Sequence, residues 1–160
     1  MKMAQMGAAE IGSALERGLA AGAFSNEDLF AGYTDEAAEN ETEARSAAPV
    51  DDFARRILPP VRDALFAADA AVSFCAATAV GGRTLCGGAG APETEVDQTT
   101  GEPSGEAVRA ALASARSETP SLIQTYRGVR AGAPAKFTEI SAPIQVAGAH
   151  WGGFRVAVTA

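Results

Sequence analysis

The stretch SAPIQVAGAHWGGFRVAVTA, residues 141–160, decides the fold because it predicts two strands joined by a tight turn. Gly148 with Ala149 marks the turn. The second strand opens with His150 and Trp151, the only histidine and the only tryptophan of the chain. Apolar residues then alternate with other residues, as in a half-buried strand. A central strand of this kind needs neighbouring strands and a covering layer of helices, which the rest of the chain should supply.

Length and charge limit the class of protein. The 160 residues fit one domain with a modest core, since roughly 100–150 residues is the commonest domain size. The formal net charge of −7 argues against a nucleic-acid partner, which needs a clustered basic surface. No apolar run approaches the roughly 20 residues of a membrane span, and the N-terminus lacks the apolar core of a signal peptide. We therefore expect a cytoplasmic protein with no membrane insertion in this chain.

The two cysteines, Cys75 and Cys86, are too few for a disulfide framework and lack the spacing of a metal site. If Gly81 and Gly82 form a two-residue hairpin turn, Ala77 lies opposite Cys86, and Cys75 lies diagonally from Cys86 on the same face. The two thiols could then be neighbours. Buried, reduced thiols are the favoured interpretation, and their redox state stays open.

The N-terminal half predicts helices. Residues 3–21 carry a narrow apolar stripe, which fits either a dimerisation or signalling helix outside the main domain or a helix packed on the chain's own sheet. This divides the chain into an N-terminal helix, 1–24, and a sensor domain, 25–160. Ser25 and Asp28 are close to a capping box that starts a short helix. Residues 32–49 are polar and acidic, and predict a long exposed loop.

Residues 51–68 form the strongest helix candidate, with one wide apolar face. Asp51 or Asp52 can cap it. Pro59 and Pro60 inside the pattern should kink or split the helix, because neither supplies a backbone donor.

The C-terminal half predicts five strands and one helix. The strands are expected at 70–79, 83–86, 121–127, 136–144 and 151–158, with a loop over 87–103. Ser104 should cap the helix, whose apolar face holds Val108, Ala111, Leu112 and Ala115. Gly152 and Gly153 remove side chains where another segment must approach the backbone closely.

This order of elements predicts an α+β fold: a five-stranded antiparallel sheet with N-terminal helices and one crossover helix. Two strands, a crossover and a three-strand meander are the layout of PAS-like sensor modules, in which the last strand returns to the middle of the sheet beside the first. One face of the sheet then carries the N-terminal helices, and the other leaves a pocket under the crossover segment.

The sequence resembles the PAS/Cache-like sensory module at the C-terminal end of many bacterial methyl-accepting chemotaxis proteins. The likeness runs from about Ile11 to Val158 and is most specific in the segment HWGGFR. That family shows a tyrosine–arginine pair on the third strand and ends in a strand pair with Pro, Ile, Val, Gly, His, Trp, Gly and Arg at fixed spacing. The positions that match are Thr125, Tyr126, Arg127, Pro143, Ile144, Val146, Gly148, His150, Trp151, Gly152, Phe154 and Arg155.

The chain departs from this family in its first hairpin. Relatives usually carry an Asn-Gly-Tyr turn followed by Pro-Thr-His-Asn, whereas here the hairpin reads TAVGGRTLCGGAG. A Tyr-Arg-Arg-Asp run is shortened to Tyr-Arg-Gly at residues 126–128. Pocket contacts made by the missing residues in relatives therefore do not carry over. The chain also has no coiled-coil signalling hairpin or methylation helices.

The candidate ligand-binding residues are Tyr126, Arg127, His150, Trp151 and Arg155; no catalytic residue and no metal ligand is expected. Arg127 and Arg155 are the stronger candidates, because an inward-facing arginine can hold a carboxylate through two parallel hydrogen bonds; the alternative for each is exposure to solvent. His150 and Trp151 are expected in structural hydrogen bonding and packing. No cofactor is expected, although noncovalent haem on His150 remains an alternative.

The expected function is a non-enzymatic, signal-sensing domain of a chemotaxis or signal-transduction system, which binds a small molecule, a carboxylate being one candidate. A homodimer is the expected assembly, with chemoreceptors or other signalling proteins as partners. Two alternatives stay open. One is a degenerate module that lacks a ligand and acts in dimerisation or protein interaction; the other is a haem or flavin sensor.

Overall fold

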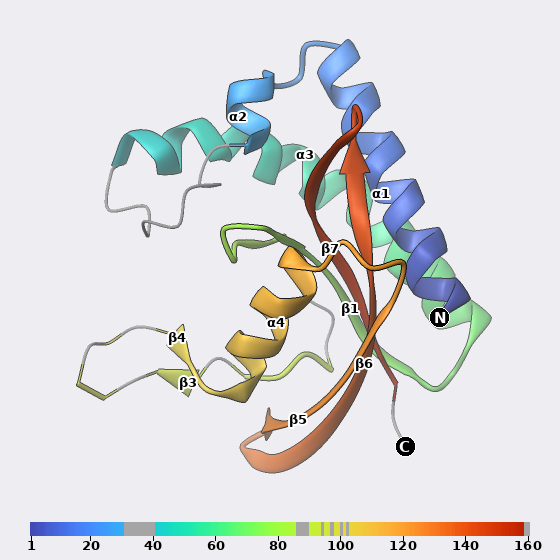
Figure 1. Ribbon diagram of the computed structural model, residues 1–160, viewed down its shortest axis with the longest axis vertical. Helices are drawn as coiled ribbons and strands as arrows, with labels where there is room; N and C mark the ends of the chain where they lie inside the picture. Colours follow the sequence, from blue (N-terminus) through green and yellow to red (C-terminus); the bar gives the residue numbers. More distant parts are fainter. Residues whose placement is uncertain are drawn as a thin grey trace.

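The computed structural model describes residues 1–30, 41–85, 90–93, 95–96, 98–99, 101 and 103–158, with backbone alone for 41–48, 96 and 103. Its centre is a five-stranded antiparallel sheet in the order β2-β1-β7-β6-β5 (Figure 1). The predicted α+β class is confirmed, and the last strand lies beside the first, as expected. The strands are β1 (Val72–Ala79), β2 (Thr84–Leu85), β5 (Leu122–Arg130), β6 (Ala133–Val146) and β7 (Ala149–Val158).

Two matching turns connect the long strands. Ala131 and Gly132 join β5 to β6 with φ of 51° and 74°, and Ala147 and Gly148 join β6 to β7 with φ of 51° and 79°. Paired positive φ angles fit two-residue turns whose twist matches that of the strands. The turn before β7 therefore lies one residue earlier than predicted, because Ala149 already belongs to the strand.

The first hairpin has a different register from the expected one. The amide of Ala79 donates to the carbonyl of Arg83 at 2.8 Å, so three residues, 80–82, connect β1 to β2. Ala77 consequently pairs with Leu85 and not with Cys86. A shift of one residue exchanges the faces of a strand, and here it places Leu85 in the core. Cys75 is buried, while Cys86 lies outside the described residues.

Helix α1 (Lys2–Ala20) packs against β6 and β7, and it belongs to the main core of the domain (Figure 1). Ile11 and Leu15 are fully buried. Glycines allow the close approach: a Cβ on Gly7 would lie 2.1 Å from the ring of Phe154, and one on Gly12 would lie 2.4 Å from the carbonyl oxygen of Gln145. Of the two possibilities open for this helix, packing on its own sheet is the one observed.

The short helix α2 (Asn26–Phe30) begins with the predicted capping box. The amide of Asp28 donates to Oγ of Ser25 at 3.1 Å, and the amide of Ser25 donates to the carboxylate of Asp28 at 2.9 Å. This reciprocal arrangement satisfies two amides at the start of the helix. The helix packs against α3.

Helix α3 (Glu41–Ala68) corrects two predictions. It begins ten residues before Asp51, so neither Asp51 nor Asp52 caps it, and residues 41–49 are helical where a loop was predicted; residues 32–40 of that loop lie outside the described residues. The helix also continues through Pro59 and Pro60, although each removes a backbone bond. Its buried face explains this continuity, because packing against α1 and β1 stabilises both halves of the helix. That face holds Val50, Ala54, Leu58 and Leu65.

The opposite face of the sheet is covered by α4 (Glu106–Arg116), which crosses from β2 to β5 (Figure 1). The two-stranded pair of β3 (Glu95–Val96) and β4 (Pro103–Ser104) precedes it, inside the stretch predicted as loop. Ser104 belongs to β4 and does not cap α4. Gly105 occupies the N-cap position with φ of 96°, a conformation that favours glycine.

The glycine pair in β7 does allow close approach, as predicted. A Cβ on Gly152 would lie 2.1 Å from the carbonyl oxygen of Thr78 in β1. One on Gly153 would lie 2.4 Å from the carbonyl oxygen of Ser114 in α4. The last turn of α4 therefore rests directly on the backbone of the central strand.

Within the described ranges, no helix combines the length and the apolar character that crossing a membrane requires.

Candidate functional site

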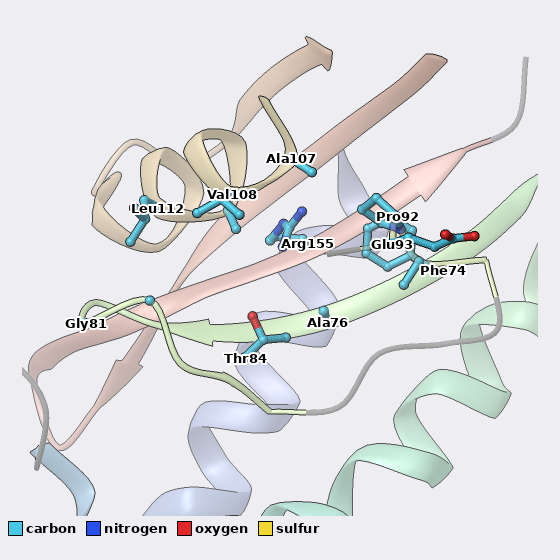
Figure 2. Close-up of a pocket in the computed structure, with 13 residues that line it drawn as sticks. Phe74, Ala76, Gly81, Thr84, Pro92, Glu93, Ala107, Val108, Leu112 and Arg155 are labelled. Carbon is cyan, nitrogen blue, oxygen red and sulfur yellow. The ribbon is translucent and has the colours of Figure 1, made fainter. Parts of the chain in front are cut away.

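A cavity of about 530 Å³ lies between the sheet and α4, on the face opposite the N-terminal helices (Figure 2). Its floor comes from β1 and β7, one wall comes from α4, and the remaining wall comes from the segments that flank β2. The cavity has the size of a small-molecule site, which commonly occupies about 300–1,000 Å³. The lining residues are Phe74, Ala76, Gly81, Gly82, Thr84, Ala91, Pro92, Glu93, Ala107, Val108, Ala111, Leu112 and Arg155.

The predicted apolar face of α4 contributes to this wall. Val108, Ala111 and Leu112 line the cavity. Ala115, the fourth residue predicted on that face, is fully buried beyond it. Small side chains on the sheet-facing side let the helix lie close to the sheet at its C-terminal end, while the cavity remains open near its N-terminal half.

The segment 90–93 closes one end of the cavity by crossing the sheet from β1 to β5. A Cβ on Gly90 would lie 2.2 Å from the carbonyl oxygen of Ser73, so this position tolerates no side chain. Further along, the amide of Glu93 donates to the carbonyl of Val129 at 2.8 Å, and its carboxylate accepts from the amide of Gly132 at 2.7 Å. Both ends of the segment are thus attached to the sheet.

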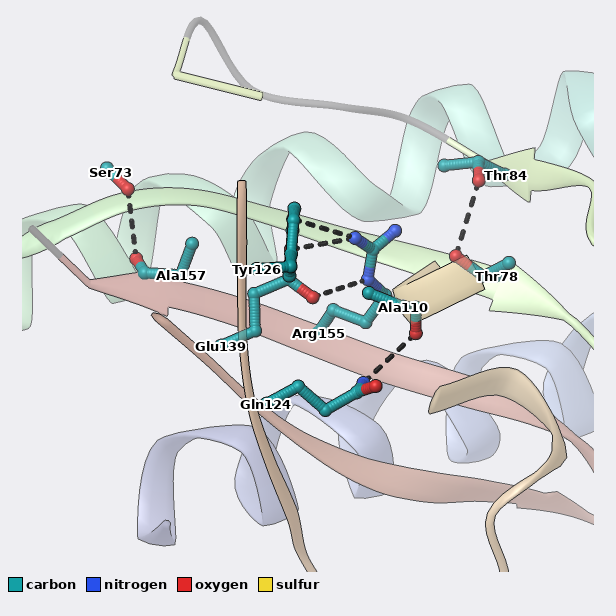
Figure 3. A network of polar contacts seen from close by, with 9 residues as sticks. All are labelled: Ser73, Thr78, Thr84, Ala110, Gln124, Tyr126, Glu139, Arg155 and Ala157. Carbon is teal, nitrogen blue, oxygen red and sulfur yellow. Dashed lines mark hydrogen bonds and ion pairs between the residues drawn. The ribbon is translucent and has the colours of Figure 1, made fainter. Parts of the chain in front are cut away.

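A buried network of three side chains joins β5, β6 and β7 beneath the cavity (Figure 3). The Arg155 guanidinium donates from Nε to Glu139 Oε2 at 3.0 Å and from Nη2 to Glu139 Oε1 at 2.7 Å. The Tyr126 hydroxyl donates to Glu139 Oε1 and accepts from Arg155 Nη2 at 3.4 Å. Glu139 is 0% exposed and Arg155 is 4% exposed. Two opposite charges are therefore paired inside the protein, where pairing offsets part of the cost of desolvation.

This environment keeps Tyr126 protonated. Burial raises the pKa of its hydroxyl well above the ordinary value near 10, and the adjacent Glu139 carboxylate raises it further; the Arg155 guanidinium opposes the shift. An un-ionised hydroxyl can continue to donate to Glu139, so the network is stable over the whole neutral range.

Arg155 is therefore an inward-facing residue of the cavity, but its paired donor edge is already occupied. The two parallel bonds expected for a ligand carboxylate are made to Glu139 instead. The guanidinium carbon of Arg155 lies 5.6 Å from the centroid of the Phe74 ring. Among the residues that the structure describes, none accepts a hydrogen bond from Nη1 of Arg155.

The other four candidates do not line the cavity. Tyr126 is buried beneath it in the network. Arg127 is exposed on the other face of β5, where its backbone amide donates to the Glu106 carboxylate at 2.7 Å. The exposure of Arg127 is the alternative that the sequence left open for it.

His150 and Trp151 hold helices on opposite faces of the sheet. His150 Nε2 donates to the carbonyl of Ala115 at 2.7 Å, near the end of α4. The Trp151 indole donates to the carbonyl of Leu29 at 3.0 Å, in α2. Both roles are structural hydrogen bonds, and His150 Nε2, the atom that would bind haem iron, is engaged.

A β-bulge allows this arrangement. Ile144 pairs with Gly152, but the next residue, Gln145, pairs with His150, so Trp151 is an extra residue in β7. In a regular strand, residues three apart face opposite sides. The bulge instead places Trp151 in the same core cluster as Phe154.

Sequence reasoning missed Glu139 as a site residue. Glu139 lies on the same face of β6 as Phe137 and Ser141, and all three are buried. The burial of the Glu139 carboxylate between apolar neighbours was not predicted. No sequence pattern gave the contact: Ser141 pairs with Arg155 because of the bulge at Trp151, and this pairing puts Glu139 diagonally across from the arginine.

Within the described part of the chain, no three histidine, cysteine, aspartate or glutamate side chains gather closely enough to hold a metal ion. Comparison with known proteins identifies no relative: no protein-family model, no curated protein sequence and no solved structure matches the chain.

Proposed function

We propose that the chain is a non-enzymatic sensory module of a signal-transduction system, of the PAS/Cache-like type found in chemotaxis receptors, and that it binds a small molecule in the cavity between α4 and the sheet. The observation that carries the proposal is the cavity of about 530 Å³ with one buried arginine in its lining. A mostly apolar cavity with a few polar groups is the usual form of a small-molecule site.

The topology supports this role. Helices α1 and α3 cover one face of the sheet, and the cavity lies on the other. A ligand on one face can therefore affect a helical layer on the other only through the sheet. A ligand acts by binding one arrangement of these layers better than another.

The His150–Trp151 pair supplies a physical connection between the layers. The first residue holds the end of α4, which walls the cavity, and the second holds α2. A shift of α4 on ligand binding would move His150 and, through the bulge, Trp151. We propose that the signal leaves the domain along this route to the N-terminal helices, in a cytoplasmic module that pairs as a homodimer or with other signalling proteins.

Ligand binding can be tested by thermal unfolding of the protein with a panel of small metabolites. A ligand present at 100 times its Kd stabilises the folded state by about 2.7 kcal/mol. For a domain of this size, that stabilisation raises the Tm by about 5–10 °C.

Two variants of α4 locate the binding site. Ala111→Phe places a ring in the cavity, and it should abolish the increase in Tm. Ala113→Phe adds the same ring at an exposed position of the same helix, and it should leave the increase intact. The proposal fails if no compound raises the Tm of the unmodified protein, or if Ala111→Phe responds as strongly as Ala113→Phe.

A further inference from the structure

The donors of Arg155 that Glu139 and Tyr126 leave unoccupied define what the cavity can bind. A guanidinium carries five N–H donors. Nε and Nη2 face Glu139 and Tyr126. Nη1, with two N–H groups, makes no hydrogen bond within the described ranges, and Arg155 lines the cavity (Figure 2). The cavity therefore presents donors from a side chain that is 4% exposed and is fixed by its other bonds.

The charge of this arginine is already compensated. Glu139 is 0% exposed and binds Arg155 through two hydrogen bonds, and Tyr126 holds the same carboxylate. A second carboxylate on Nη1 would approach the buried charge of Glu139, and like charges repel strongly where water is excluded. Glu93, the remaining charged residue of the lining, is also negative. The electrostatic environment thus disfavours an anion.

The rest of the lining is apolar. Apart from Arg155, Glu93 and Thr84, the cavity is lined by aliphatic side chains, glycine and the ring of Phe74. An apolar ligand body is favoured there in proportion to the surface it buries. A single acceptor oxygen on such a ligand would accept a hydrogen bond from Nη1. A wholly apolar ligand would give Nη1 no hydrogen bond.

From this geometry we infer that the ligand is an uncharged, largely apolar carbonyl compound, whose carbonyl oxygen accepts a hydrogen bond from Nη1 of Arg155. This inference rests on the proposed binding function and specifies the ligand class of the same cavity. It replaces the carboxylate considered from the sequence alone, because Glu139 occupies the position that a carboxylate ligand would need.

Three probes of similar size separate the contributions: acetophenone, benzoate and ethylbenzene. Binding is measured by protein-observed NMR titration at millimolar concentrations, on the full chain and on Ala111→Phe. Acetophenone should bind about tenfold or more tightly than benzoate, since Glu139 opposes the anion. It should also bind more tightly than ethylbenzene, which lacks the acceptor. Ala111→Phe should lose acetophenone binding.

Glu139→Gln tests the electrostatic cause. The amide oxygen can still accept from Arg155, but the carboxylate charge is gone, so the preference should move towards benzoate by about tenfold or more. If this variant does not fold, the comparison of probes on the unmodified protein still decides the question.

The inference is overturned if benzoate binds as tightly as acetophenone or more tightly, with binding still sensitive to Ala111→Phe; the cavity would then be a binding site of another chemistry. It is also overturned if acetophenone and ethylbenzene bind equally, or if acetophenone does not bind at all. Insensitivity of every probe to Ala111→Phe would instead contradict the proposed binding function itself.

Discussion

The two faces of the sheet are built from different side chains. On the face of α1 and α3, the sheet contributes Trp151, Phe154, Val156 and Ile144, and all are almost completely buried. On the face of α4, the helix contributes mainly alanine, and the sheet places a charged pair in the interior. One face is packed with apolar groups alone, whereas the other combines the rings of Phe74, Phe137 and Tyr126 with alanine, a cavity and a buried charged pair.

The difference indicates which face stabilises the fold and which face has room for a ligand. Burying a large apolar side chain contributes about 1.5–3 kcal/mol. A buried ion pair contributes little net stability, because desolvation offsets most of its Coulomb energy. The face covered by α1 and α3 can thus stabilise the fold. The α4 face instead holds buried polar groups that contribute little net stability. This asymmetry supports the proposal that the site lies on the α4 face.

Breaking the ion pair should give the largest effect. Glu139→Ala leaves Arg155 as an uncompensated buried charge, which should lower the free energy of unfolding by about 3–5 kcal/mol. Chemical denaturation measures the change.

The matched control removes the charges together. Arg155→Met, Glu139→Leu and Tyr126→Phe in one chain should restore most of the stability, because replacing a buried ion pair by apolar residues is often neutral. If the triple variant is as unstable as Glu139→Ala, the pair stabilises the α4 face directly, and the contrast between the faces is wrong.

A change on the face covered by α1 and α3 should have a smaller effect on the free energy of unfolding. Gly12→Ala places a Cβ 2.4 Å from the carbonyl oxygen of Gln145, so α1 must move away from β6. Overpacking costs about 1–3 kcal/mol, and the better helix propensity of alanine returns up to about 1 kcal/mol. We expect a net loss of about 1–2 kcal/mol in the free energy of unfolding.

Ser13→Ala is the control for this prediction, because Ser13 is exposed on the same helix and its change should stay within about 0.5 kcal/mol. The proposed route from the cavity to the N-terminal helices requires that a displacement of α1 also changes ligand affinity, so Gly12→Ala should alter the affinity and Ser13→Ala should not. Equal affinity in the two variants would contradict the proposed route.

The sequence predicts the sheet well because its patterns are local. Alternation of apolar residues predicts both β6 and β7, although each strand begins two to three residues earlier than predicted, and glycine places the turn between them to within a residue. The close approach at Gly152 and Gly153 follows from the missing side chains alone. These features depend on neighbours in the chain.

The errors concern features that depend on tertiary contacts. Pro59 and Pro60 do not end α3, because contacts with α1 and β1 outweigh two missing backbone bonds. The register of β1 and β2 depends on a loop one residue longer than the glycine pair suggests.

The site shows the same limit. Arg155 is placed correctly at the pocket, but its partner Glu139 could be identified only from the pairing of β6 with β7. The ligand contact that we propose for Arg155 depends on that partner, which the sequence did not reveal.

The smallest predicted effect concerns pH and again distinguishes the faces. The pKa of Tyr126 is raised in the folded protein by burial and by Glu139, whereas an unfolded tyrosine has a pKa near 10. Above pH 10 the unfolded chain releases this proton first, so the folded state is disfavoured as pH rises. The contribution of Tyr126 to stability is complete below pH 10 and declines above it, by up to about 1.4 kcal/mol per pH unit. Tyr126→Phe should remove this part of the alkaline slope, while Gly12→Ala should retain it. Urea denaturation between pH 8 and 11 measures both slopes, and equal slopes in the two variants would place the hydroxyl in contact with water instead of within the network.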